Sequence, residues 1–126
     1  MGSIKTPIVG TELKIRVGVT SGNKNWKDLD SDHPSDFTLQ FYVGDFASAQ
    51  SASKVVTITG EAPTDVPDGT YLALVDTAVT GAGTLMLRVT LDEYDADYED
   101  EPLSDESTGY RREIATYNTG IKVYNG

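Results

Sequence analysis

Apolar and polar residues alternate with a period of two along several short segments of this sequence, and this pattern constrains the fold most. The clearest segment is FTLQFYV, at residues 37–43, in which every second residue is apolar. Segments 11–20 and 84–91 alternate in the same way, with Leu, Ile and Val at the apolar positions. Successive side chains of a β-strand point to opposite faces of its sheet, so each segment is expected to form a half-buried strand.

Seven segments of this kind are separated by stretches rich in turn-forming residues. We expect strands at residues 11–20, 37–43, 54–59, 70–76, 84–91, 110–116 and 121–124. Gly, Pro, Asn and Asp recur between them, and these residues favour turns because they accept unusual backbone angles or bond to nearby backbone groups. Short strands at this spacing are typical of antiparallel sandwiches. The sequence therefore predicts an all-β fold, an antiparallel two-sheet sandwich of the immunoglobulin-like type with about seven strands and no disulfide.

Two details of the strand arrangement are also predicted. Residues 54–59, KVVTIT, are mostly β-branched and are expected to form a strand near an edge of a sheet. Residues 70–76 and 84–91 flank the turn-like Gly81-Ala82-Gly83, and we expect them to form a hairpin.

Length and composition limit the organisation and the partners of the chain. The sequence has 126 residues, which favours a single domain over residues 1–126. It has no cysteine, which excludes disulfides and thiolate metal sites. Its 20 acidic and 10 basic residues give a formal charge of -10, which repels nucleic acid and anionic membranes. We therefore expect no cofactor, no nucleic-acid partner and no membrane partner.

Acidic residues are concentrated in a stretch at residues 92–106 that contains no basic residue. Its first part holds Asp92, Glu93, Asp95, Asp97, Glu99, Asp100 and Glu101. Such a stretch could ligate Ca²⁺, yet the glycine and the closing glutamate of an EF-hand loop are not at the required spacing. Runs of like charge are more often solvated or meet a surface of opposite charge. We expect these residues to be solvated or to contact a basic partner surface, and we expect no metal.

Three further residues are candidates for partner contacts. Trp26 lies in the polar stretch 21–36, and we expect its ring to cover an open end of the sandwich or to contact a partner. Arg111 and Arg112 are adjacent, so in a strand they point to opposite faces and only one can face solvent freely; we expect the other to pair with a carboxylate.

No constellation of catalytic residues is recognisable in the sequence. His33 is the only histidine and lies in the same polar stretch, and no Gly-x-Ser-x-Gly turn is present to hold a nucleophile beside it. We therefore expect a non-enzymatic protein without catalytic residues.

Short motifs in the second half of the chain resemble small structural domains of tailed bacteriophages. The motifs are Val75-Asp76-Thr77, Gly81-Ala82-Gly83, Arg111 or Arg112 with Glu113, and Thr119-Gly120-Ile121. The order of a Val-Asp-Thr strand end, a Gly-x-Gly turn, an acidic loop and a Thr-Gly-Ile segment is similar to virion proteins of crAss-like phages that infect Bacteroides-type hosts. It also resembles the N-terminal domain of phage baseplate upper proteins. The resemblance implies a virion component and carries over no catalytic residues.

The functional expectation combines this resemblance with the absence of a recognisable catalytic constellation in the sequence. We expect an auxiliary or decoration-type virion protein that binds and stabilises or decorates a capsid or tail lattice, with other virion proteins as partners in many copies. It would be assembled in the host cytoplasm and reside in the virion. Residues 4–10 are a further candidate for contact, as an added strand on a neighbour. The alternative is a carbohydrate-binding or adhesin-like sandwich module, with calcium as an aid and Trp26 in the sugar platform.

Overall fold

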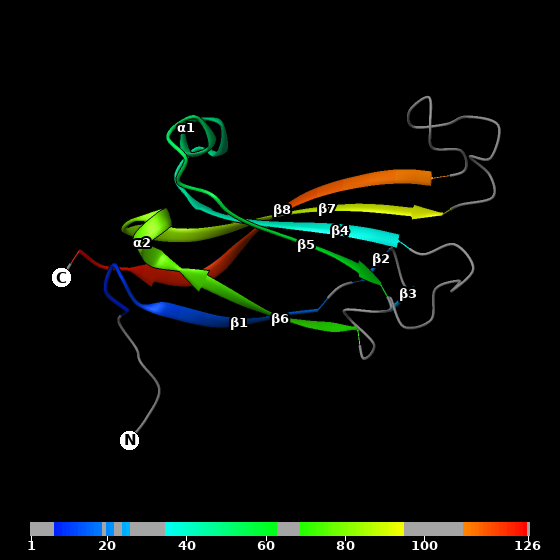
Figure 1. Ribbon diagram of the computed structural model, residues 1–126, viewed down its shortest axis with the longest axis horizontal. Coiled ribbons are helices and arrows are strands. Elements are labelled where there is room, and N and C mark those ends of the chain that lie inside the picture. Colours follow the sequence, from blue (N-terminus) through cyan, green and yellow to red (C-terminus); the bar gives the residue numbers. More distant parts are fainter. Residues whose placement is uncertain are drawn as a thin grey trace, which may run out of the picture.

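The computed structural model in Figure 1 shows two antiparallel β-sheets that face each other. It describes residues 7–18, 20–21, 24–25, 35–62, 69–94 and 110–125. The larger sheet has the strand order β5 (Val56–Ala62), β4 (Ser35–Val43), β7 (Gly83–Tyr94) and β8 (Tyr110–Val123). The smaller sheets pair β1 (Glu12–Gly18) with β6 (Thr70–Asp76) and β2 (Thr20–Ser21) with β3 (Lys24–Asn25). The predicted all-β antiparallel sandwich is confirmed, as is the edge position of β5, whereas the immunoglobulin-like assignment stays a prediction.

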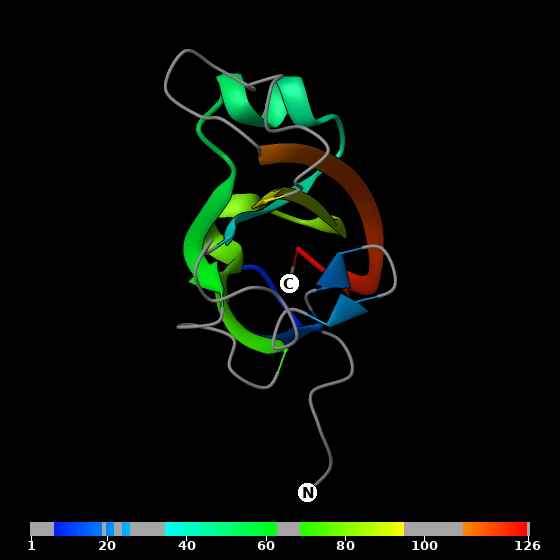
Figure 2. The ribbon, with the colours of Figure 1, turned by 90° about the vertical axis from the view of Figure 1, so that its right-hand side faces the viewer.

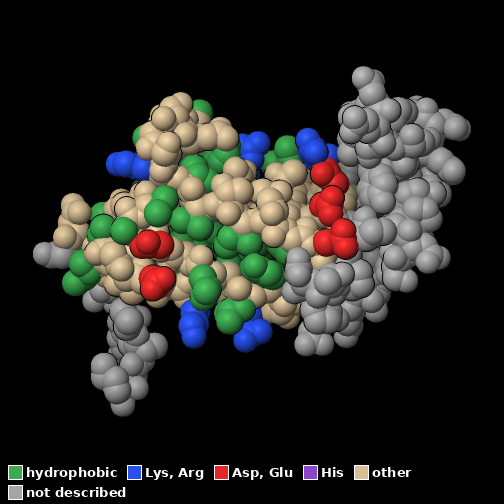
Figure 3. Space-filling model, in the orientation of Figure 1, with side chains coloured by type: hydrophobic (Ala, Val, Ile, Leu, Met, Phe, Trp, Pro, Cys, Tyr) green, Lys and Arg blue, Asp and Glu red, His purple; other side chains and the backbone are tan. Residues whose placement is uncertain are grey.

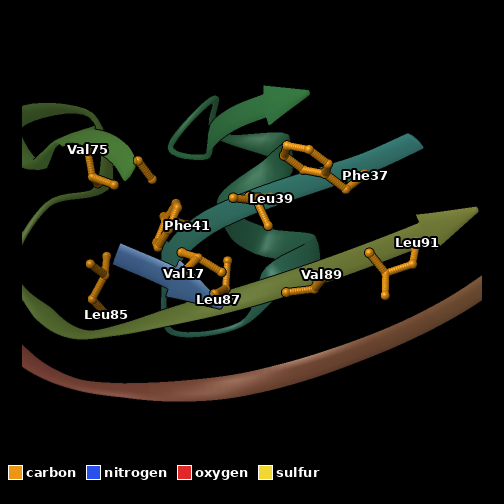
Figure 4. Close-up of a cluster of buried hydrophobic side chains, with 10 residues drawn as sticks. Val17, Phe37, Leu39, Phe41, Val75, Leu85, Leu87, Val89 and Leu91 are labelled. Atoms are coloured by element: carbon orange, nitrogen blue, oxygen red, sulfur yellow. The ribbon is translucent and has the colours of Figure 1, made fainter. Parts of the chain in front are cut away.

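The alternation along β4 and β7 builds the core between the sheets. Phe37, Leu39 and Phe41 of β4 are at most 1% exposed. They lie beside an aliphatic row on β7 that consists of Leu85, Leu87, Val89 and Leu91. The smaller sheet covers both rows with Val17, Ala73 and Val75. Figure 4 shows these side chains gathered into one cluster, so the period-two pattern positions the core as predicted.

The hairpin expected between residues 70–76 and 84–91 does not form. Strand β6 pairs with β1, whereas β7 pairs with β4 and β8. A single helical turn, α2 (Thr77–Thr80), carries the chain from the smaller sheet to the larger one. Asp76 caps this turn, because its carboxylate accepts a hydrogen bond from the backbone N–H of Ala78 at 2.9 Å. The connection between the two strands is therefore a crossover between sheets and not a tight turn.

The last two expected strands are one strand, β8, interrupted by a bulge. Thr84 of β7 pairs with Lys122, whereas Met86 pairs with Asn118, so β8 carries extra residues over this interval. A bulge of this kind bends a strand and increases its local twist. The prediction of seven strands was wrong in this respect, and the described residues contain six strands of seven or more residues.

The bulge turns the end of β8 toward the smaller sheet, and Figure 2 shows the strand curving around the molecule. At the bulge, the Thr119 hydroxyl donates to a β7 carbonyl at 2.7 Å, and Gly120 adopts a φ of 77° that favours glycine. Beyond it, Tyr124 forms a parallel bridge with Ile8. The described part of segment 4–10 therefore pairs with the C-terminal end of its own chain, and docking of the segment on a neighbour stays a prediction.

Thr77 joins the N-terminal segment to α2 at this same end of the sandwich. The side chain of Thr77 is buried, and its hydroxyl donates to the carbonyl of Thr11 at 2.7 Å. The same oxygen accepts a hydrogen bond from the backbone N–H of Gly10 at 2.9 Å. One hydroxyl thus satisfies a backbone donor and a backbone acceptor that belong to the segment entering β1.

Replacing Thr77 by valine is expected to lower the free energy of unfolding by about 0.5–1.5 kcal/mol, because the backbone N–H of Gly10 loses its partner and the carbonyl of Thr11 keeps only the hydrogen bond from the backbone N–H of Thr77. Urea denaturation followed by circular dichroism measures the change. Thr80→Val is the matched control, since Thr80 is also buried but its hydroxyl makes only contacts of 3.4 Å. An equal loss in both variants would contradict the role given to the Thr77 hydroxyl.

A short helix, α1 (Phe46–Ser51), covers part of the outer face of the larger sheet (Figure 1). Tyr42 on this face is buried, and its ring meets that of Phe46 edge-on at 5.2 Å between centroids. The guanidinium of Arg88 lies 4.3 Å from the centre of the Phe46 ring. Tyr42 of β4 therefore packs between the larger sheet and α1.

Candidate contact site

A groove opens between the free edges of β1 and β8. Within the described part of the chain, β1 pairs only with β6, and β8 pairs with β7 and, at Tyr124, with the N-terminal segment. The groove has a volume of about 320 Å³. Its lining consists of Val17 and Gly18 from β1, Leu87, Val89 and Leu91 from β7, and Glu113, Ala115 and Tyr117 from β8. We call this feature the β1–β8 groove; it has an apolar floor and a strand edge along each side.

The side chains of β8 explain why the core is open here. Opposite the aliphatic row of β7, this strand directs Glu113, Ala115 and Tyr117 inward. Ala115 is too short to reach β1, and Tyr117 remains 55% exposed. Ile114, the one aliphatic residue of this stretch large enough to fill the space, points outward and is 53% exposed. Pairing with β7 sets this register, so a groove remains above Leu87, Val89 and Leu91, which are themselves only 6–9% exposed.

An ion pair links β7 and β8 close to the end of their ladder. The Arg112 guanidinium donates from Nε to Oδ1 of Asp92 at 2.7 Å and from Nη2 to Oδ2 at 3.0 Å. Arg112 thus pairs with a carboxylate although its side chain is 54% exposed, whereas the pair was expected for the arginine that cannot face solvent freely. Asp92 and Arg112 face the outer side of the sheet, whereas Glu113 faces the groove.

Two more carboxylates lie in the same cross-strand row. Asp36 pairs with Asp92 on one side and with Glu61 on the other, so the row runs from β5 to β8 and ends at Arg112. Figure 3 shows acidic side chains gathered at this end of the molecule. No group of three or more His, Cys, Asp or Glu side chains among the described residues is arranged to hold a metal ion. The row is therefore a negatively charged surface on the outer face of the larger sheet, whereas the groove lies on the inner face.

Replacing Arg112 by glutamine is expected to lower the free energy of unfolding by less than about 1 kcal/mol, because both partners are partly exposed to screening water. The hydrogen bond with Asp92 and the attraction between their charges raise the pKa of Arg112. Stabilisation by a cation whose pKa is raised on folding is complete below the unfolded-state pKa and is lost only as pH rises through the folded-state value. Both values lie far above neutrality.

The loss caused by Arg112→Gln should therefore be the same at about pH 7 and about pH 9, since arginine stays protonated at both. Urea denaturation at the two pH values measures it, with Lys54→Gln at another exposed position as the control. A loss that disappears at the higher pH would contradict this assignment.

The structure places the remaining predicted site residues only in part. The backbones of Glu93 and Arg111 pair with each other across β7 and β8. The others, Trp26, Asp95, Asp97, Glu99, Asp100 and Glu101, lie outside the described residues. The contact role of the acidic stretch and of Trp26 thus stays a prediction.

The groove itself was not predicted from the sequence. A signal was present in segment 110–116, where Ala115 occupies an inward position and Ile114 an outward one. The alternation alone would assign Ile114 to the core, and only the pairing partner shows that it faces out. Which strand edges stay unpaired is likewise a property of the sheet order and not of any single segment.

Comparison of the chain with protein-family models, with curated proteins and with solved structures gives no match. Among the described residues, no helix is long and apolar enough to cross a membrane.

Proposed function

We propose that this chain is a non-enzymatic structural protein of a tailed-phage virion, which binds a capsid or tail lattice and stabilises or decorates it. The observation that carries the contact function is the β1–β8 groove. An extended segment that enters such a groove gains main-chain hydrogen bonds from a strand edge and buries side chains on an apolar floor. The groove is thus suited to hold a strand of a partner protein.

The negative row on the outer face of the larger sheet, across β8 from the groove, can add selectivity to contacts at this end of the molecule. Asp36 is exposed, and the side chain of Asp92 is 28% exposed although it is paired with Arg112. Complementary charge around an apolar centre steers association and excludes partners of the wrong sign. A partner surface that is basic opposite this row would therefore be favoured.

The assignment to a phage virion rests on the sequence motifs. Three of them have structural roles in the fold. Val75-Asp76-Thr77 leads into α2, and Gly81-Ala82-Gly83 leads into β7. Thr119-Gly120-Ile121 forms the bulge of β8. The resemblance therefore concerns the framework of the fold and leaves the groove free to differ between proteins.

Mass spectrometry of purified virions tests the proposal, and the chain is expected there at high copy number. Ala115→Arg would fill the groove and should reduce incorporation, whereas Thr116→Arg changes the exposed face of the same strand and serves as the matched control. Absence of the wild-type chain from virions would overturn the virion assignment. Equal incorporation of both variants would overturn the role of the groove.

Exposed Tyr117 beside the groove supports a second candidate function, a carbohydrate-binding module. An aromatic ring that is 55% exposed offers a face on which a sugar can stack. A glycan array with the wild-type protein and with Tyr117→Ala tests this function. Specific binding that is lost on substitution would favour the module, and the absence of binding would exclude sugars of the array as ligands.

A further inference from the structure

The free edge of β1 combines exposed basic side chains with an apolar inner face. Lys14 and Arg16 point outward and are exposed, whereas Val17 on the other face belongs to the buried core. Leu13 and Ile15 pack against the same core. Figure 3 shows basic side chains along the side of the molecule that β1 and β6 form. An added strand would therefore meet positive charge on one face and apolar groups on the other.

This charge pattern disfavours pairing of β1 with β1 of a second copy. If two such strands paired antiparallel around Ile15, Lys14 of one copy would lie opposite Arg16 of the other. Like charges directly opposite each other destabilise a strand pair, and charged side chains on edge strands are a common protection against such pairing. A favourable partner strand would instead carry carboxylates at alternate positions and small or aromatic residues between them.

The chain itself contains a segment with this pattern. Asp95, Asp97 and Glu99 alternate with Ala96 and Tyr98. In an extended conformation the three carboxylates would share one face and the other two residues the opposite face. Residues 95–99 lie outside the described residues.

We infer that residues 95–99 of a second copy bind the free edge of β1 as an added strand in the β1–β8 groove. Their carboxylates would lie opposite Lys14 and Arg16, and Ala96 and Tyr98 would cover the groove floor beside Ala115. This names the partner for the contact function proposed above and rests on it. Because the donor and acceptor surfaces differ, the contact is head-to-tail and joins copies into a ring or an open array.

The donor is assigned to a second copy because of where β7 ends. This strand remains extended and paired with β8 up to Tyr94, which lies opposite Tyr110. Strand β8 lies between β7 and the β1–β8 groove, so a donor segment of the same chain would have to pass β8, whereas the groove is open to a second copy.

Sedimentation of the full chain at protein concentrations up to about 1 mM, which reaches weak specific association, tests the inference. The wild-type protein is expected to self-associate. Lys14→Glu with Arg16→Glu, and separately Asp95→Lys with Asp97→Lys, should each weaken association about tenfold or more. Mixing the two double variants should restore association, because each then meets a complementary charge.

The controls separate specific pairing from net charge. Lys54→Glu reverses an exposed lysine away from the groove, and Asp105→Lys reverses an acidic residue outside the alternating segment. Both should associate like the wild type, and thermal melts should show all variants folded. Wild-type protein that stays monomeric would overturn the inference, as would association that survives the aspartate reversals or is not restored by mixing. Detection of the chain in virions with no self-association would leave the proposed function intact and overturn only this partner.

Discussion

Replacement of Phe41 by alanine should lower the free energy of unfolding by about 3–5 kcal/mol, the usual loss for a buried aromatic ring. Phe41 is fully buried and lies in β4 between neighbours on both sheets. Removing the ring loses its transfer free energy and leaves a cavity that the surrounding strands can close only in part. The loss is a large fraction of the roughly 5–15 kcal/mol that stabilises a typical domain.

Urea denaturation followed by circular dichroism measures this effect. The matched control is the same substitution at Phe46, which lies on α1 and is only partly buried. The smaller burial there predicts a smaller loss. If Phe46→Ala cost as much as Phe41→Ala, the core between the sheets would not be the main source of stability.

Gly83→Ala is the second substitution with a large expected effect. Gly83 has a φ of 134°, a conformation that costs a residue with a Cβ about 1–3 kcal/mol. A Cβ at this position would also overlap Cγ1 of Val43, and overpacking adds about 1–3 kcal/mol. Both terms act at the point where the chain enters β7, so relief would require a shift of the backbone there or a different rotamer of Val43.

Two comparisons separate these terms by urea denaturation. Gly120→Ala introduces a Cβ at a φ of 77° with no atom within 4 Å, and should show the backbone cost alone. Combining Gly83→Ala with Val43→Ala should cost less than the sum of the single substitutions, because the overlap disappears. Strict additivity would show that the overlap with Val43 contributes nothing.

The strands of the core could be predicted from the sequence because their pattern is local. Residues 37–43 alternate without interruption, and the structure buries Phe37, Leu39 and Phe41 as the pattern indicates. The same reasoning failed at segment 110–116, where Ile114 faces solvent. Alternation shows that a strand has two different faces. Where both faces carry polar and apolar residues, it does not show which of them meets the core.

The partners of the strands could not be predicted in the same way. Gly81 and Gly83 were interpreted as a hairpin turn, whereas the capped helical turn α2 carries the chain across to the other sheet. Pairing of β6 with β1 and of β7 with β4 depends on contacts between residues far apart in the chain. Such contacts leave little trace in a local pattern of turn residues.

The candidate site likewise combines a feature that was expected from the sequence with one that was not. The opposite directions of neighbouring side chains in a strand led us to expect a carboxylate partner for the arginine that cannot face solvent freely, whereas the Arg112–Asp92 pair lies on the exposed outer face. The β1–β8 groove did not follow, because it exists only where two strand edges lie side by side without pairing.

The sequence by itself determined that the chain forms half-buried strands, where the principal core residues lie and that the protein is strongly acidic. Side-chain period and charge are properties of neighbouring residues and can be read along the chain. The tertiary structure alone decided the sheet order, the bulge in β8 and the opening beside Ala115. These depend on hydrogen bonds and packing between distant segments, whose relative free energies no single segment contains.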